Sequence, residues 1–478
     1  MTDQGSVTDR ESVTDRESVT DQEEIEARLS VVWGAPVTAT VPSTLPGGAS
    51  RQTMRFTAET ADGPRDLVLR RDLSGPAGAA TMDLEARVMA AAAAAGVPVP
   101  ELVDSGPSLG GNPYIVMSHV AGEVIPRRLL RDEAYATARE TLAAQFGAIA
   151  ARIHTMSPDT LGGLARQDPI AALRALAERW DTPRPSVELG IRWLEEHPVP
   201  AVADTVVHGD LRNGNAIVGP EGIRAVLDWE LVHRGDPVED LGWLCVKAWR
   251  FGSALPVGGF GTRAQLLDGY EEVAGWRPTD AQLHWWEVYS TLRWVLICRQ
   301  QAAVHLEGEQ DSLEHAVIGR RVCEAEFDLL LTLGLTHPEK TDDVLTAVDA
   351  AESETVGTGA APHDAPDADH LLAVVERTLV RGELGAQGGA RYLARVAAAA
   401  LRIARREILL SAEVAGRHRE RLAGLGFATE QDLAAALRSG AVAPGTPGVV
   451  EAVVGTVRDK LLVANPGYLG RPAAPEEG

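Results

Sequence analysis

The chain has 478 residues, which is longer than one ordinary hydrophobic core, so two or three domains are expected. Its 45% hydrophobic and 24% charged residues are typical of a soluble globular protein. The formal net charge of −23 argues against a general nucleic-acid or anionic-membrane binder, because phosphate-rich surfaces attract a basic face. The net charge is compatible with a local basic pocket.

Cysteine usage and the N-terminal residues indicate a cytoplasmic protein. Cys245, Cys298 and Cys323 are widely spaced and lack metal-ligand spacing, which fits a reducing compartment. The N-terminus is acidic and polar, unlike a signal peptide. No apolar run approaches the roughly 20 residues that a membrane helix needs. No membrane partner is therefore expected.

The first half of the chain predicts a repeat tail and a small mixed region. Residues 1–24 contain a repeated SVTDRE hexapeptide with little to bury, so this tail is predicted to be disordered. Residues 25–117 should form a β-rich lobe. Its expected elements are strands at 53–57, 67–70 and 114–117, and a helix at about 84–95.

The rest of the chain is predicted to be mainly helical. Residues 118–334 should form a second lobe with helical periodicity over 134–156, 168–197 and 262–333. Residues 335–368 are rich in Ala, Gly, Pro and acids, which indicates a linker. A helical bundle over 369–465 and a disordered tail over 466–478 should follow. The four expected bundle helices are 369–382, 388–414, 417–438 with a break near Gly426, and 447–463.

The bundle is predicted to fold separately and to contribute no catalytic group, because it lacks a cluster with chemical spacing. It could bind a protein partner or a second copy of the chain. An arginine stripe recurs along its second helix, and this stripe could bind an anionic ligand or form a solvated face paired with acids. Its members are Arg391, Arg395, Arg402 and Arg405.

The strongest chemical signal is the segment from His208 to Asp228. His208-Gly-Asp210 is followed by Asn215 and by two short apolar strands around the turn 219–222. Folding this hairpin brings Asn215 opposite Asp228, and a carboxamide with a carboxylate suits Mg²⁺. Asp210 lies five residues before Asn215, within reach of the same cavity. The H-x-D-x₄-N plus D pattern is that of kinase-type phosphoryl transfer.

On these residues the sequence resembles the aminoglycoside phosphotransferase and choline-kinase group of the protein-kinase-like fold, over roughly residues 28–333. The resemblance implies an α+β bilobal fold with a small mixed β-rich N-lobe and a mainly helical C-lobe, here followed by an all-α bundle. It also implies ATP and Mg²⁺ as cofactors, with Asp210 as the catalytic base and Asn215 and Asp228 as metal ligands.

The resemblance assigns further residues around the nucleotide. Period two puts Val68 and Arg70 on one strand face and Arg71 on the other. Val68 would touch adenine, and Arg70 would bind the α- and β-phosphates and pair with Glu85. The wider family usually has lysine at this position, whereas a subset similar to the phosphotransferase domain of acyl-CoA-dehydrogenase-associated proteins tolerates arginine. Arginine keeps the charge but is a wider planar fork.

Two loops complete the expected nucleotide site. Residues 47–51 occupy the place of the phosphate-covering loop, where Ser50 and its neighbours could cradle phosphate or form a plain turn. Residues 117–122 should be the interlobe hinge, with Met117 and His119 beside adenine. Structural support of the site is expected from His208, Asp236 and Asp240.

The expected function is transfer of the γ-phosphoryl group of ATP to a hydroxyl of a small molecule. The acceptor would be a metabolite, such as a hydroxyacyl thioester, with an aminoglycoside as second choice. The alternative is a nucleotide-binding pseudoenzyme that acts as a regulatory or scaffold protein. Arg70 and the irregular glycine loop favour this alternative, whereas the intact Asp210, Asn215 and Asp228 set disfavours it.

Overall fold

The computed structural model describes residues 21–45, 51–74, 78–179, 183–308, 312–340, 346, 368–381 and 388–470. The described residues form two compact units, which are interleaved in sequence. Unit 1 holds residues 1–166, 201–244 and 260–278, and unit 2 holds residues 167–200, 245–259 and 279–478. Within the described ranges, no helix combines the length and the apolar character needed to cross a bilayer.

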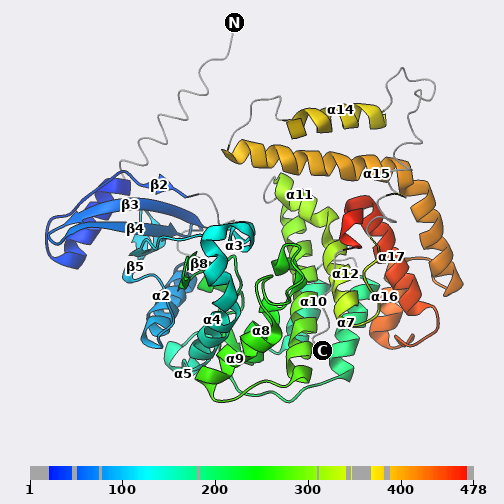
Figure 1. Ribbon diagram of the computed structural model, residues 1–478, viewed down its shortest axis with the longest axis horizontal. Coiled ribbons are helices and arrows are strands. Elements are labelled where there is room, and N and C mark those ends of the chain that lie inside the picture. Colours follow the sequence, from blue (N-terminus) through cyan, green and yellow to red (C-terminus); the bar gives the residue numbers. More distant parts are fainter. Residues whose placement is uncertain are drawn as a thin grey trace, which may run out of the picture. The chain divides into compact units, whose positions relative to one another are not determined.

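Unit 1 contains a six-stranded antiparallel sheet of order β1-β3-β4-β6-β5, with β2 paired to β3 (Figure 1). The predicted strands lie within β3, β4 and β6, whereas the shorter or more polar β1, β2 and β5 were not predicted. The strands are β1 Thr38–Ala39, β2 Ser43–Thr44, β3 Gln52–Thr60, β4 Gly63–Arg71, β5 Leu102–Leu109 and β6 Asn112–Ser118.

Alternation along these strands gives the sheet two different faces. One face packs on a helix over residues 21–33, in a core that includes Ile25, Leu29, Phe56 and Leu67. That helix overlaps the predicted disordered tail, which is therefore wrong for residues 21–24; residues 1–20 lie outside the described residues. Asp21 accepts hydrogen bonds from Arg71 at 2.6 and 2.7 Å.

The predicted hairpin forms as β8 and β9 and packs on α4. Helix α2 packs against β5 and β6, and α4 packs against α9, β7, β9 and α8. Gly147 and Gly269 allow a close crossing of α4 and α9, since an added Cβ would lie 2.1 Å from a carbonyl oxygen of the other helix. The bounds are α2 Ala79–Ala94, α3 Pro126–Arg131, α4 Ala136–His154, α5 Pro158–Leu161, β7 Thr205–Val207, β8 Ala216–Gly219, β9 Gly222–Val226, β10 His233–Gly235, α8 Val238–Leu244 and α9 Arg263–Ala274.

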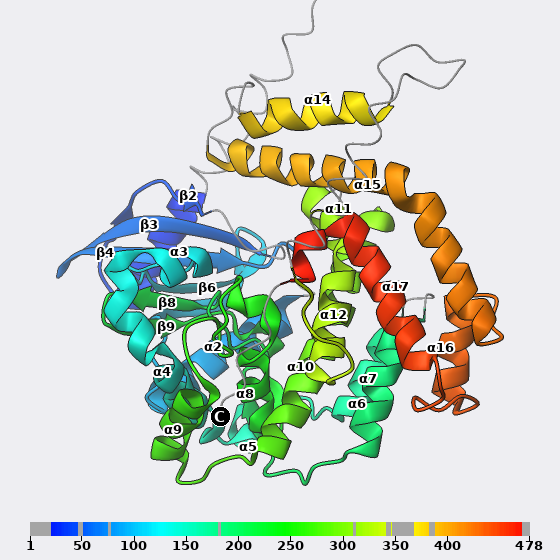
Figure 2. The same ribbon diagram turned by 45° about the vertical axis from the view of Figure 1, so that its right-hand side comes forward.

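Unit 2 is helical, and Figure 2 shows α14 lying along α15. Capping boxes begin α10 and α16, where Thr279 and Thr429 bond the backbone of the first turn. The bounds are α6 Pro169–Glu178, α7 Pro185–Glu196, α10 Asp280–Leu306, α11 Leu313–Arg320, α12 Val322–Thr332, α14 Ala368–Arg381, α15 Gly388–Gly424, α16 Glu430–Ser439 and α17 Val449–Ala464.

One helix boundary of the predicted bundle is corrected, and two arginines of the stripe follow one of its two expected alternatives. The expected boundary between 414 and 417 is absent, because α15 continues to Gly424 before the left-handed Gly426. In the arginine stripe, Arg402 and Arg405 both pair with Glu376 of α14 at 3.3 Å. These two members therefore belong to an acid-paired helix face.

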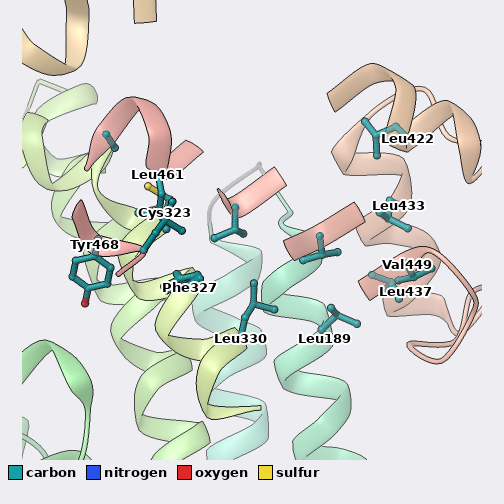
Figure 3. Packing of buried hydrophobic residues seen from close by; sticks show 14 residues of the cluster. Leu189, Cys323, Phe327, Leu330, Leu422, Leu433, Leu437, Val449, Leu461 and Tyr468 are labelled. Atoms are coloured by element: carbon teal, nitrogen blue, oxygen red, sulfur yellow. The ribbon is translucent and has the colours of Figure 1, made fainter. Parts of the chain in front are cut away.

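Helices from both sides of the predicted linker share one hydrophobic core. Figure 3 shows Leu189 of α7 and Phe327 and Leu330 of α12 in one cluster with bundle residues. The bundle contributes Leu422, Leu433, Leu437, Val449, Val453, Val457, Leu461, Ala464, Tyr468 and Leu469. A common core of this kind argues against a bundle that folds separately.

Polar contacts join the same helices. Arg438 donates to Glu188 of α7 at 2.6 Å, and the hydroxyl of Tyr468 donates to Asp328 of α12 at 2.7 Å. Tyr468 ends the short 3₁₀ helix Pro466–Tyr468 and is buried. The predicted disordered tail is therefore wrong for residues 466–470, and its remainder lies outside the described residues.

We expect Leu437→Ala to lower the free energy of unfolding by about 2–5 kcal/mol, because it removes a fully buried side chain. All ten tryptophans lie before residue 295, so tryptophan fluorescence in urea reports only on the part before the linker. The tryptophan transition should shift to lower urea concentration.

The matched control is Leu306→Ala, at a leucine of α10 that is 81% exposed, which should change stability by no more than about 0.5 kcal/mol. An independently folding bundle would give a different result. Leu437→Ala would then leave the tryptophan transition unchanged and shift a separate transition seen by circular dichroism.

Candidate active site

Asp210 lies in the loop between β7 and β8, where three side chains donate hydrogen bonds to it. Its Oδ1 accepts from Nε1 of Trp243 at 2.8 Å and from Nε of Arg212 at 2.9 Å. Its Oδ2 accepts from Nδ2 of Asn215 at 2.6 Å. A carboxylate has about four acceptor positions, so Asp210 can accept one further donor such as a hydroxyl.

The backbone of this loop is held by Asp240 of α8, which is fully buried. The N–H groups of His208 and Gly209 each donate to its carboxylate at 2.9 Å, and Nε2 of His154 lies 3.1 Å from Oδ2. Burial acts to raise the pKa of Asp240, but the hydrogen bond and charge of His154, the charge of His208 and the backbone hydrogen bond from His208 together outweigh it, so the pKa lies below its usual value. Gly209 has φ of 79°, and a Cβ there would lie 2.5 Å from the Leu231 oxygen.

The His208 ring connects the loop to the end of the hairpin. Its Nδ1 accepts the N–H of Asp210 at 3.2 Å, and its Nε2 donates to the Leu227 oxygen at 3.1 Å. These partners require the hydrogen on Nε2. The ring also packs on Trp229, with 4.5 Å between centroids. His208 therefore fixes the spacing between Asp210 and the segment that carries Asp228.

The hairpin brings Asn215 and Asp228 to one end. Strands β8 and β9 pair antiparallel, and the N–H of Leu227 donates to the backbone carbonyl oxygen of Asn215 at 2.8 Å. Asn215 and Asp228 both line a cavity of about 460 Å³. Asp228 has φ of 68°, a left-handed conformation that costs energy for a residue with a Cβ and is typical of functional positions.

The donor set at this end of the cavity suits a hard cation. Asn215 turns its Nδ2 toward Asp210, which leaves its carboxamide oxygen for a cation, and Asp228 supplies a carboxylate. The described residues contain no group of three or more His, Cys, Asp or Glu arranged for a metal. Two protein oxygens are nevertheless a fit for Mg²⁺, which commonly takes its other ligands from substrate phosphates and water.

Arg70 supplies the positive charge of the cavity. Its Nη1 lies 2.5 Å from Oε1 of Glu85 on α2, and its Nη2 lies 3.2 Å from Oδ1 of Asp228. Burial acts to lower the pKa of Arg70, but the charges of Glu85 and Asp228 outweigh it and raise the pKa. The second oxygen of Glu85 accepts from Arg51, a buried residue immediately before β3.

The apolar wall of the cavity comes from Val68 and Met117, which are direct partners across β4 and β6. His119 also lines the cavity, but its N–H already donates to the Asp66 oxygen at 2.9 Å. That N–H is therefore not available to adenine, and the expected hinge contact has to come from other backbone atoms. Ser50 lies outside the described residues.

Two further acids near the site have raised pKa values. Burial raises the pKa of Glu230, and the negative charge of Asp228 adds to this effect. Burial also raises the pKa of Asp236, whose carboxylate accepts the N–H groups of Val202 at 2.8 Å and Val238 at 2.9 Å. Asp236 thus holds the start of α8.

Sequence reasoning missed Arg51 and Trp243. Thr53 lies directly opposite Arg70, and Arg51, two residues earlier, falls on the same face as Thr53. The alternation of the strand could therefore have indicated Arg51 as a diagonal neighbour of Arg70. Trp243 follows Asp240 by three residues on α8, and this spacing puts both side chains on one helix face. No local pattern indicated that this face meets the loop of Asp210.

A family model described as "Phosphotransferase enzyme family" matches residues 42–280, half of the chain. The chain belongs to the phosphotransferase enzyme family. The match contains the loop of Asp210, the hairpin, and all of β3, β4 and α2. Residues 384–468 match a second model, described as a domain of unknown function, DUF6285. The resemblance seen in the sequence is thereby confirmed.

Two curated relatives match part of this phosphotransferase. Acyl-CoA dehydrogenase family member 10 of mouse is 32% identical over 208 residues, which is 40% of this chain and 19% of that protein. Acyl-CoA dehydrogenase family member 11 of chicken is 31% identical over 196 residues, which is 38% of this chain and 25% of that protein. This phosphotransferase therefore aligns with only a minor part of each relative.

The fold is also similar to a solved structure. A protein from Ralstonia eutropha that is classed with the aminoglycoside phosphotransferases superposes with a TM-score of 0.53 and 22% identity. The superposition covers 65% of this chain and 97% of the other. The kinase-like fold with its mixed N-terminal region and helical C-terminal part is therefore confirmed.

We expect Asp240→Asn to destabilise the protein at neutral pH. Each carboxylate oxygen of Asp240 accepts a backbone N–H, whereas the side chain of Asn has only one oxygen that can accept. The loss of one acceptor for a buried N–H costs about 1–3 kcal/mol. The pKa of Asp240 is lower in the folded than in the unfolded protein. Ionised Asp240 therefore contributes fully to the free energy of unfolding at a pH above its unfolded pKa, and this contribution is lost as the pH falls through its folded pKa. Urea unfolding at pH 7 and at successively lower pH should show the difference from wild type shrinking in acid.

The control for this measurement is Asp83→Asn, at a surface aspartate of α2 whose side chain is 68% exposed. It should leave the free energy of unfolding within about 0.5 kcal/mol of wild type. A difference between Asp240→Asn and wild type that grows in acid would contradict the assigned role.

Proposed function

We propose that this phosphotransferase moves the γ-phosphoryl group of ATP to a hydroxyl of a small molecule, with Mg²⁺ as the metal. The observation that carries the proposal is the joint position of Asp210, Asn215 and Asp228. Asn215 donates to Asp210 at 2.6 Å, and Asn215 and Asp228 line one cavity together with Arg70. A loop carboxylate beside two metal-binding oxygens and one cation is the set that phosphoryl transfer requires.

Each residue has a distinct part in this proposal. Asp210 accepts a hydrogen bond from the acceptor hydroxyl and orients its oxygen toward the phosphorus. Trp243 and Asn215 hold the two oxygens of Asp210 and limit its rotation. Arg70 binds phosphate oxygens, while Val68 and Met117 supply an apolar wall for the base. Positioning and charge account for most of the rate in such reactions.

Asn215 and Asp228 are the residues that hold the metal. Bound Mg²⁺ supplies positive charge that neutralises the nucleotide phosphates. Nδ2 of Asn215 donates to Asp210 at 2.6 Å, which leaves the carboxamide oxygen of Asn215 for the cation, and Asp228 lines the same cavity as Asn215.

The proposed acceptor is a hydroxyl on an acyl thioester, with an aminoglycoside as second choice. The names of both curated relatives refer to acyl-CoA, and each is at least 31% identical over its matched segment. The structural neighbour is classed by name with the aminoglycoside enzymes, but its identity is only 22%. A screen of hydroxyacyl thioesters and aminoglycosides by ADP release separates the two classes.

We expect Asp210→Asn to reduce turnover by about 10²–10⁴-fold, because general-base groups contribute this much. Affinity for Mg-ATP should stay within a few-fold of wild type, since Asp210 binds the acceptor side. Turnover is measured by ADP release with the acceptor found in the screen, and affinity by calorimetry. Near-normal turnover in purified Asp210→Asn would remove Asp210 from the mechanism. A wild type that binds Mg-ATP but transfers nothing to any acceptor would favour a pseudoenzyme.

We expect Asp228→Ala to abolish the tightening of ATP binding by Mg²⁺. Calorimetry with ATP in excess Mg²⁺ and in EDTA should give two clearly different affinities for wild type and nearly equal ones for the variant. Asp83→Ala, at an exposed aspartate on α2, is the matched control and should keep the wild-type difference. Retained metal dependence in Asp228→Ala would contradict its assignment as a ligand.

A further inference from the structure

Arg51 is a buried cation within the site whose role is not explained by the assignments above. Its side chain is only 4% exposed. Nη1 donates to Oε2 of Glu85, and Nη2 lies 3.9 Å from Oε2 of Glu230. Arg51 therefore lies beside α2, which carries Glu85, and beside the segment that follows Asp228.

Glu85 is shared by two arginines, one at each oxygen. Oε1 accepts from Nη1 of Arg70, and Oε2 accepts from Arg51. An arginine that faces a carboxylate alone commonly bonds both oxygens with two nitrogens. Because Arg51 occupies Oε2, Arg70 uses only one nitrogen for Glu85. Its Nη2 instead points to Asp228 at 3.2 Å.

We propose that Arg51 is a positioning residue that keeps the second nitrogen of Arg70 directed into the nucleotide cavity. This inference rests on the proposed function, because it assumes that Arg70 binds ATP phosphates. Arg51 and Arg70 together face three carboxylates, those of Glu85, Asp228 and Glu230, so Arg51 acts on the direction of Nη2 of Arg70 and not through an excess of positive charge. A lysine at position 70 has a single nitrogen and needs no such partner.

The arrangement predicts a specific fault when Arg51 is lost. With Oε2 of Glu85 vacant, the guanidinium of Arg70 can bond both oxygens and turn Nη2 away from Asp228. The variant then keeps the Arg70–Glu85 ion pair but loses a phosphate contact. Mg-ATP affinity falls, whereas a purely structural arginine would alter stability without this selective effect.

The test is a double-mutant cycle on the full chain, read by calorimetry of Mg-ATP binding. Arg51→Gln should weaken binding by about 10-fold or more, the size of one charge-assisted hydrogen bond. Arg51→Lys should restore most of the affinity, because its ammonium can occupy Oε2. In a Glu85→Gln background, Arg51→Gln should change the affinity by less than about 2-fold. The control Arg55→Gln, at an exposed arginine on β3 that pairs with Asp66, should bind like wild type.

The outcomes separate this inference from the proposed function. If wild type does not bind Mg-ATP, the proposed function fails and this inference fails with it. If wild type binds and Arg51→Gln binds equally well, only the inference is overturned. It is also overturned if Arg51→Gln weakens binding equally with and without the Glu85 carboxylate, or if Arg51→Lys does not restore affinity. Thermal unfolding of each variant identifies any loss of affinity that is caused by misfolding.

Discussion

The geometry of the candidate site depends on the hydrogen bonds that the buried carboxylate of Asp240 accepts. A charge without contact to water costs several kcal/mol unless donors surround it. Asp240 meets this requirement with the N–H groups of His208 and Gly209 and with the ring of His154. The loop therefore cannot shift without leaving the charge unsatisfied, and Asp210 is fixed as a consequence.

The same constraint reaches the end of the hairpin that carries Asn215 and Asp228 through His208. Its ring bonds the backbone on both sides, at Asp210 and at Leu227, so the loop and the hairpin keep one relative position. Trp243 lies on the helix that carries Asp240 and donates to the Asp210 side chain. One short helix, α8, thus holds both the backbone of this loop and the carboxylate of its Asp210.

The sequence was most informative where contacts are local. Asn215 and Asp228 are joined by a short hairpin, and period two placed Val68 and Arg70 on one strand face, so spacing alone predicted both pairs. Trp243 and Asp210 are 33 residues apart, and Arg51 and Glu85 are 34 apart. No periodicity connects such pairs, because tertiary packing brings them together. The linker composition led to the expectation of a separately folding bundle. Composition does not reveal that α16 packs on α7 and that α17 packs on α12.

The shared core of unit 2 has a consequence for the order of folding during protein synthesis. Leu189 of α7 lies in a core that includes residues beyond 430, and Glu188 pairs with nearby Arg174 and also with Arg438, which is 250 residues away. A ribosome that adds about 5–20 residues per second needs roughly 10–50 s to make that stretch. During this interval α7, and later α12, lack the contacts that α16 and α17 provide, whereas the last residue of unit 1, residue 278, is made well before α16 and α17. Nascent chains of this protein therefore pass through a long period in which a chaperone has exposed leucine surface to bind.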